Sequence, residues 1–246
     1  MLIIKPFIFK RFSEIVFGFS TKIGPDAEPP YYFNLSYSVG DEKEIVDSNR
    51  RLFFRELGLN EKMVSYQKQV HEDKINTVNS FGSCGESDAL ITTTKNLGLA
   101  ISSADCPAIF IYDPMQKVIA AVHSGWRGTE KKILRKTIQK LKSDFSSNPS
   151  NLICYIGPSI SQNNYEVGEE VAGKFEKEFI LKKENRFYID LSEANHKMLV
   201  DEGVKEVNIQ VSGLCSFEYN NLLHSYRRDG IESGRALGVI SMKGHD

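Results

Sequence analysis

Cys106 and His123 are the two residues of this sequence whose chemistry and spacing stand out. Two apolar, strand-like runs, 108–112 and 117–122, are separated by a turn signal, Asp-Pro-Met-Gln at 113–116. Positions 106 and 123 average to 114.5, the middle of this turn, so antiparallel pairing about it places their Cβ atoms roughly 5 Å apart. A thiolate and an imidazole at that separation can share one zinc ion, whose bonds to sulfur and nitrogen are about 2.3 and 2.0 Å.

His71 is the best candidate for a third ligand. Segment 65–71 alternates like a half-buried strand and leads into the polar loop 71–74. Among the five histidines, His71 and His123 are the two that fall at strand-to-loop transitions, where binding sites tend to be built. Without a third ligand, a buried Cys106 and a capping His123 at strand ends would explain the pair equally well.

The elements that must position these residues form a mixed series. Many apolar runs follow one another too closely for crossover helices, so much of the sheet must be antiparallel. The predicted strands are 15–20, 64–70, 75–78, 89–93, 98–102, 108–112, 117–122, 152–156, 206–211, 223–226 and 237–242. Three helices are predicted, at 45–57 ending at Gly58, at 133–141, and at 191–200 with Asp190 or Ser192 as N-cap. No linker or composition break divides the chain, which predicts one domain over residues 1–246.

Composition and charge favour a small-molecule enzyme. The 246 residues carry 31 basic and 32 acidic side chains, a net charge of -1 that gives no electrostatic footprint for nucleic acid or an anionic membrane. No run approaches the roughly 20 apolar residues that span a bilayer, and Lys5, Pro6 and Lys10 interrupt the N-terminal apolar run, unlike a secretory signal. We therefore expect a cytoplasmic protein, in which reduced thiols suit a cysteine ligand.

Six ordered motifs resemble those of the laccase-domain family. They are Gln69-Val70-His71, Ala104-Asp105-Cys106-Pro107, His123-Ser124-Gly125-Trp126-Arg127-Gly128, Ile156-Gly157-Pro158, Tyr165-Glu166-Val167-Gly168, and Ser225-Tyr226-Arg227-Arg228-Asp229-Gly230 with Gly234-Arg235. Members of that family have been described as polyphenol oxidoreductases and more recently as purine nucleoside phosphorylases with adenosine deaminase activity. The resemblance implies an α+β fold, a layered sandwich of mixed, largely antiparallel sheets flanked by helices.

The resemblance also implies a mononuclear zinc site of His71, Cys106 and His123. Three protein ligands leave the fourth tetrahedral position open, as in catalytic zinc sites. A multicopper oxidase would instead need a trinuclear cluster, which draws on His-x-His pairs, and this chain has five scattered histidines and no such pair. We expect zinc, although a soft Cys-His-His site could also take up copper.

Arginines and one asparagine are the predicted contacts for substrate and phosphate. The loop 125–128 leads into a helix, so its free N–H groups and Arg127 could bind phosphate, unless Arg127 pairs with a carboxylate such as Asp105. Arg228 is predicted to face the pocket, from a cationic group in which surface ion pairing is the alternative. Asn34 could bind a ribose or a base edge, and a turn-stabilising asparagine is equally consistent with its setting.

The implied chemistry has two branches at one metal. Phosphorolysis of adenosine, inosine or methylthioadenosine would give the free base and ribose 1-phosphate, which carries the methylthio group when methylthioadenosine is the substrate. In deamination, zinc lowers the pKa of a water molecule and Asp105 moves the proton, unless Asp105 only orients a metal-binding histidine. The alternatives are a copper-dependent polyphenol oxidase, a peptidoglycan-editing or cell-wall quality-control factor, and, without a metal, a cysteine hydrolase that uses Cys106 and His123.

Overall fold

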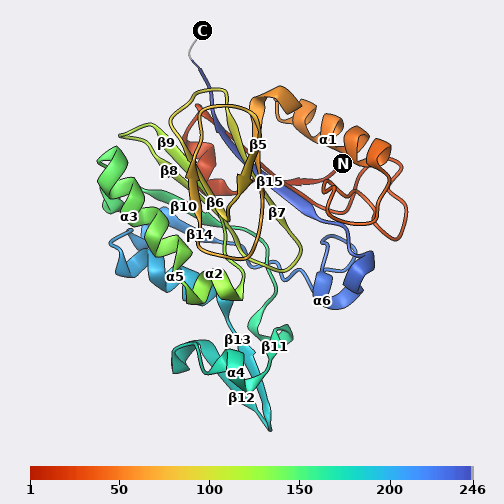
Figure 1. The fold of residues 1–246 in the computed structure, drawn as a ribbon, viewed down its shortest axis with the longest axis vertical. Helices are drawn as coiled ribbons and strands as arrows, with labels where there is room; N and C mark the ends of the chain where they lie inside the picture. The colour runs from red at the N-terminus through yellow and green to blue at the C-terminus, as the bar shows by residue number, and fades with distance from the viewer. Residues whose placement is uncertain (245–246) are drawn as a thin grey trace.

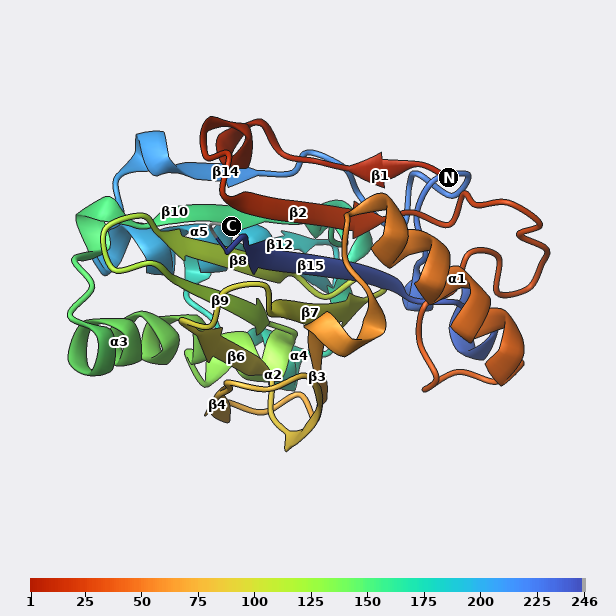
Figure 2. The same cartoon turned by 90° about the horizontal axis from the view of Figure 1, so that it is seen from above.

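Two six-stranded sheets face each other in the computed structural model, which describes residues 1–244 (Figures 1 and 2). The first sheet consists, in spatial order, of β1 (Ile3–Ile4), β2 (Ile15–Ser20), β15 (Ala236–Met242), β7 (Gly98–Ser103), β3 (Val64–Lys68) and β5 (Gly82–Glu86). The second consists of β14 (Ile209–Val211), β10 (Ile153–Ile156), β8 (Ala108–Asp113), β9 (Val118–His123), β6 (Ala89–Thr92) and β4 (Ile75–Thr77). Antiparallel pairs dominate, and β3 and β4 supply most of the parallel ones.

The central strands are apolar on both faces because each sheet packs against the other sheet on one face and against helices on the other. Along β8, Phe110 points into an aromatic core between the sheets, whereas Ile109 and Ile111 point outward toward helices. The inner core contains Phe17, Phe19, Phe110, Tyr112 and Tyr155. Successive side chains of a strand point to opposite faces, so one apolar run contributes to two separate cores.

Three helices cover the outer faces, as predicted. Helix α1 (Lys43–Glu56) packs on the first sheet, while α3 (Ile133–Phe145) and α5 (Leu191–Asp201) pack on the second (Figure 2). Gly58 follows α1 with a φ of 69°, and Asp190 caps α5 by accepting a hydrogen bond from the Glu193 N–H, at 2.9 Å. The α+β sandwich flanked by helices is thus confirmed. Within residues 1–244, no helix has the length and apolar character that crossing a membrane would require.

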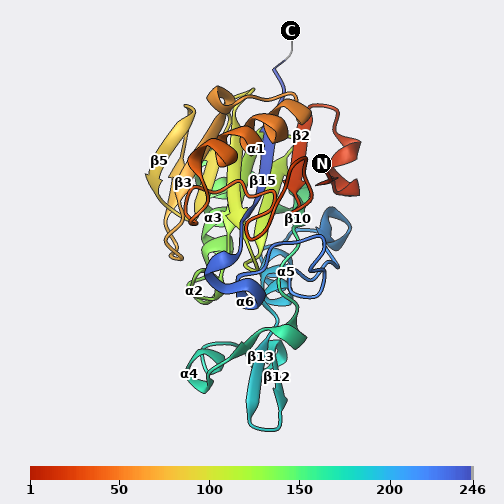
Figure 3. The ribbon, with the colours of Figure 1, turned by 90° about the vertical axis from the view of Figure 1, so that its right-hand side faces the viewer.

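A small module extends from one end of the sandwich and was not predicted. It contains the three-stranded sheet β11 (Glu166–Val167), β13 (Arg186–Ile189) and β12 (Ile180–Lys183), with helix α4 (Glu169–Ala172) beside it (Figures 1 and 3). The short helices α2 (Trp126–Glu130) and α6 (Tyr226–Asp229) lie between the sandwich and this module (Figure 3). The remaining elements are the 3-10 turns η1 (Phe7–Arg11), η2 (Glu61–Met63), η3 (Pro149–Asn151), η4 (Gln162–Asn164), η5 (Lys177–Phe179), η6 (Glu206–Asn208) and η7 (Gly230–Glu232).

The hairpin of β8 and β9 corrects the predicted pairing of Cys106 with His123. His123 pairs with Ala108, so the hairpin is centred at 115.5 and the predicted register is wrong by two residues. The loop covers 114–117 instead of 113–116, because Asp113 still pairs with Val118 and Lys117, with a left-handed φ of 52°, belongs to the turn. Cys106 therefore lies beyond the paired strand, in the loop that precedes β8.

Two predicted strands also need correction. Segment 223–226 is not a strand, because the Ser225 hydroxyl accepts a hydrogen bond from the Arg228 N–H and caps α6 instead. In the predicted strand 206–211, the first half forms η6 and only 209–211 pairs, with β10. Both errors fall where polar residues interrupt the apolar run.

Candidate metal centre and cavity

His71, Cys106 and His123 meet where β3, β7 and β9 end. His123 is the last residue of β9 and is buried, Cys106 is half-buried, and His71 is exposed three residues after β3. Their ligand atoms all lie within 4.8 Å of one another, and the two imidazole rings are perpendicular with centroids 4.7 Å apart. In the part of the chain that the structure describes, they are the one group of three or more His, Cys, Asp or Glu side chains close enough to hold a metal.

Gly125 provides the space beside these three side chains. A Cβ at this position would lie 3.0 Å from Cys106 Sγ, 3.3 Å from His71 Cδ2 and 3.7 Å from His123 Cε1. Bare backbone therefore closes one side of the donor set. One sulfur and two nitrogen donors suit a divalent ion such as zinc, and the three residues fit such an ion with one tetrahedral position left open.

At neutral pH the group pairs a Cys106 thiolate with a protonated His123, so a metal that binds both residues must displace a proton from the His123 ring. Burial acts to raise the pKa of the Cys106 thiol, but hydrogen bonds and charge from His123, with a further contribution from His71, lower that pKa to about 6. Burial likewise opposes the charged form of His123, but its hydrogen bonds with Asp88 and Cys106 raise the pKa of this imidazole to about 9. The thiolate is the form of cysteine that binds metals.

Asp88 connects both histidines, a role that was not predicted from the sequence. Asp88 directly precedes β6 in the chain, and its carboxylate is fully buried. Its Oδ1 lies 2.8 Å from His123 Nδ1 and accepts the backbone N–H of His71 at 3.0 Å. Its Oδ2 accepts the N–H groups of Val70, at 3.1 Å, and Glu72, at 2.9 Å.

Asp105 faces the cavity but does not orient a metal-binding histidine, which was the alternative role considered for it. Its Oδ1 accepts a hydrogen bond from the Ser216 hydroxyl at 2.6 Å, and its Oδ2 accepts the Arg227 N–H at 2.7 Å. The residue is buried and has a φ of 99°. Asp105 thus ties the Cys106 loop to α6, and Asp88 takes the orienting position.

A cavity of about 670 Å³ opens beside the three candidate ligands. Its basic lining residues are Lys68, Arg127, Arg227 and Arg235, and its aromatic lining residues are Trp126, Tyr165 and Tyr226. Asp105 is the one carboxylate among the described lining residues. The cavity therefore combines positive charge with flat apolar surfaces, which suits a ligand with an anionic group and an aromatic ring.

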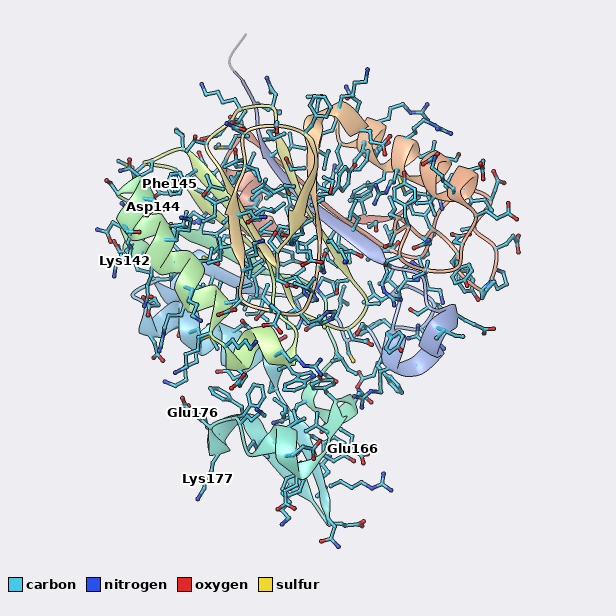
Figure 4. All side chains as sticks on the ribbon, in the orientation of Figure 1. Lys142, Asp144, Phe145, Glu166, Glu176 and Lys177 are labelled. Atoms are coloured by element: carbon cyan, nitrogen blue, oxygen red, sulfur yellow. The ribbon has the colours of Figure 1, made fainter. Side chains whose placement is uncertain are left out.

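Two of these arginines are held in place by backbone carbonyls. Arg227 donates from Nη1 to the carbonyl of Glu166 at 2.7 Å, at the junction between the module and the sandwich (Figure 4). Arg235 donates from Nη1 to the carbonyls of Ser233, at 2.6 Å, and Gly234, at 3.0 Å. Arg127 is exposed and lies over the Trp126 ring, 4.4 Å from its centroid. Each guanidinium keeps further N–H donors beyond these contacts.

Arg228 and Asn34 lie outside the cavity lining, and their polar groups are used within the protein. The five N–H donors of the Arg228 side chain contact the carbonyls of Ser216, Phe217 and Leu223 and both carboxylate oxygens of Asp229. Asn34 is buried, and its Oδ1 accepts the N–H groups of Ser36 and Arg235, each at about 3 Å. The turn-stabilising alternative therefore describes Asn34, and the geometry gives no support to substrate binding by Arg228.

Comparison with known proteins agrees with this fold. The profile of the family described as multi-copper polyphenol oxidoreductase laccase matches residues 16–243. The chain is 30% identical to purine nucleoside phosphorylase YlmD of Bacillus subtilis, covering 94% of this chain and 89% of the relative, and 34% identical to a purine nucleoside phosphorylase of Deinococcus radiodurans, covering 92% and 88%. It resembles the crystal structure of Bacillus licheniformis hypothetical protein YfiH with a TM-score of 0.90 and 29% identity, covering 96% of this chain and 94% of that structure. It resembles Geobacillus stearothermophilus YlmD with a TM-score of 0.90 and 28% identity, covering 95% of this chain and 93% of that structure.

Proposed function

This chain belongs to the family described as multi-copper polyphenol oxidoreductase laccase, and we propose that within it the protein is a metal-dependent purine nucleoside phosphorylase. The observation that carries the proposal is one cavity in which a Cys-His-His donor set faces arginines and aromatic rings. Phosphorolysis needs a nucleoside and phosphate together, and this lining offers complementary groups for both.

The family description names multicopper chemistry, but residues 1–244 contain no second group of candidate metal ligands. His196 lies 3.0 Å from Glu206 Oε2 on the surface, and buried His224 lies 3.4 Å from the carbonyl oxygen of Phe33. Neither belongs to a group of three candidate ligands. A multicopper relay needs two sites, so we favour a single ion at His71, Cys106 and His123, with zinc as the metal that suits these donors.

Phosphate recognition is assigned to Arg127, Arg227 and Arg235. Guanidinium groups bind phosphate through paired, charge-assisted hydrogen bonds. Because backbone carbonyls already hold Arg227 and Arg235, these side chains lose less conformational freedom when phosphate arrives. Arg127 has more freedom and completes the cationic lining from α2.

The nucleoside would lie between the aromatic rings and the candidate ligands. Trp126 and Tyr226 offer flat surfaces to a purine, and a bound divalent ion would supply Lewis acidity next to it. A phosphate oxygen bonds to C1′ as the bond from C1′ to the purine nitrogen breaks, and the bonding pair leaves with the base. Burial raises the pKa of the Tyr165 phenol, which keeps its proton and can donate a hydrogen bond to the departing purine.

Adenosine deamination is a second proposal, favoured by the coordination position that three protein ligands leave for water. Asp105 is the carboxylate available to move a proton, but each of its oxygens already accepts a hydrogen bond. Proton transfer through Asp105 would therefore disturb its contact with Ser216 or with the Arg227 backbone. For this reason we place deamination behind phosphorolysis.

A product assay tests the proposed function. Metal-loaded protein is incubated with adenosine, inosine or methylthioadenosine, with and without phosphate. We expect the free base and ribose 1-phosphate, or methylthioribose 1-phosphate from methylthioadenosine, only when phosphate is present. Cys106→Ser should lower this activity by more than about 100-fold because it removes a candidate ligand. Cys84→Ser is the matched control, since Cys84 is also half-buried but contacts the Tyr66 carbonyl instead. Inosine formed from adenosine without phosphate would support deamination, and the absence of both products would overturn the proposal.

A further inference from the structure

We propose that Asp88 is the positioning residue of the metal centre, in which one carboxylate sets the orientation of both histidine ligands. The inference rests on the metal centre of the proposed function and goes beyond it by naming what holds that centre in shape. The two carboxylate oxygens of Asp88 together face four N–H groups, one from an imidazole ring and three from consecutive backbone amides. The residue has no exposed surface, so water does not compete for these bonds.

For His123, Asp88 selects the nitrogen that faces the metal. An ionised carboxylate only accepts hydrogen bonds, so at 2.8 Å from Asp88 Oδ1 the ring nitrogen Nδ1 must carry the proton. In the neutral ring, Nε2 then keeps its lone pair on the opposite side. That side faces Cys106 and His71, so the tautomer fixed by Asp88 is the one that can ligate.

For His71, Asp88 acts through the backbone. His71 has a φ of 60°, in the left-handed region that costs a residue other than glycine roughly 1–2 kcal/mol. The N–H groups of Val70, His71 and Glu72 all converge on the same carboxylate, which stabilises this turn as an anion stabilises a backbone nest. This backbone turn directs the exposed His71 ring toward the buried His123 ring.

Charge explains why a carboxylate suits this position better than an amide. A divalent ion with the Cys106 thiolate and two neutral imidazoles carries a net charge of +1, which the buried Asp88 carboxylate neutralises. In Asp88→Asn, one oxygen becomes an NH2 donor that must face either the Val70 and Glu72 amides or the His71 amide and the His123 ring. The first arrangement loosens the turn, and the second favours the His123 tautomer that cannot ligate.

The test measures zinc affinity by chelator competition, without nucleoside or phosphate, so its result does not depend on phosphorolysis. We expect Asp88→Asn to bind zinc about 10- to 100-fold more weakly than the wild type and to show altered absorption bands when loaded with Co²⁺. Asp113→Asn is the matched control, because Asp113 is equally buried and accepts the N–H groups of Met115 and Gln116 in the distant hairpin loop. Its zinc affinity should stay within about threefold of the wild type, which is small beside the effect of losing an orienting group.

The inference would be overturned if Asp88→Asn had the zinc affinity and the Co²⁺ spectrum of the wild type. It would also be overturned if Asp113→Asn lost as much zinc affinity as Asp88→Asn. A second measurement does not depend on the folding of any variant. In the zinc-loaded wild type, nitrogen NMR of the imidazole rings should place the His123 proton on Nδ1. A proton on Nε2 would overturn the assignment.

Discussion

The two sides of the cavity are built differently. The metal side consists of residues at the ends of central strands, where His123 is buried and the Asp88 carboxylate behind it has no exposed surface. The arginine side is carried by the short helices α2 and α6 and by Arg235 directly before β15, with Arg127 and Arg227 exposed. The cavity therefore combines candidate ligands fixed by the core with a more open, cationic arginine side.

This difference predicts how each side responds to substitution. On the metal side one carboxylate and one glycine affect several ligands together, so a single change should disturb the whole centre. On the other side three separate guanidinium groups share one role, so each should contribute separately.

Gly125→Ala should have the largest effect. The new Cβ would lie 3.0 Å from Cys106 Sγ and 3.3 Å from His71 Cδ2, so these two candidate ligands must shift away from it and from the position they share with His123. We expect zinc affinity to fall by about 100-fold, as large as the loss of an orienting group, measured by chelator competition. Gly213→Ala is the control, because a Cβ there meets no atom within 4 Å. Unchanged zinc affinity in Gly125→Ala would mean that the ligands do not need this space.

Arg235→Lys should have a smaller and more selective effect. Lysine keeps the charge but loses the planar fork, so we expect the KM for phosphate to rise about tenfold while zinc affinity stays unchanged. Arg228→Lys should show the opposite pattern, a loss of about 1–3 kcal/mol in the free energy of unfolding with little change in this KM. If Arg228→Lys raised the KM as much as Arg235→Lys, the division between these two arginines would be wrong.

The proximity of the three candidate ligands could be predicted from the sequence because these residues lie at the ends of apolar runs. His71, Cys106 and His123 each follow or precede such a run, and the runs themselves indicate where strands end. The register of the hairpin was not predictable, since nothing in the sequence marks Lys117 as left-handed. Asp88 was missed because its role arises from the pairing of β6 with β9, which brings together residues 35 positions apart.

The arginine side was harder to predict because it depends on directions within very short elements. Arg227 and Arg228 are neighbours in α6, yet Arg227 faces the cavity and Arg228 binds carbonyls behind it. A single helical turn gives no hydrophobic periodicity from which to assign these faces. The module that holds Glu166 was missed for a related reason, because its strands have only two to four residues.

His224, which lies next to the arginine side, should make the free energy of unfolding slightly dependent on pH. This imidazole is buried next to Gly234, where a Cβ would lie 2.6 Å from its Cε1, and burial lowers its pKa to about 3. Between pH 6.5 and 3 the unfolded chain therefore binds a proton that the folded protein does not, so stability falls as the pH falls.

For this one group the loss is about 0.8 kcal/mol at pH 6 relative to pH 8, from an unfolded pKa near 6.5. Denaturant unfolding of the wild type and of His224→Gln at both pH values measures it, because glutamine has no proton to gain. We expect the variant to lose correspondingly less stability between pH 8 and pH 6. An identical pH dependence in the two proteins would show that His224 is not held neutral, and that the wall around Gly234 is open enough to admit its charge.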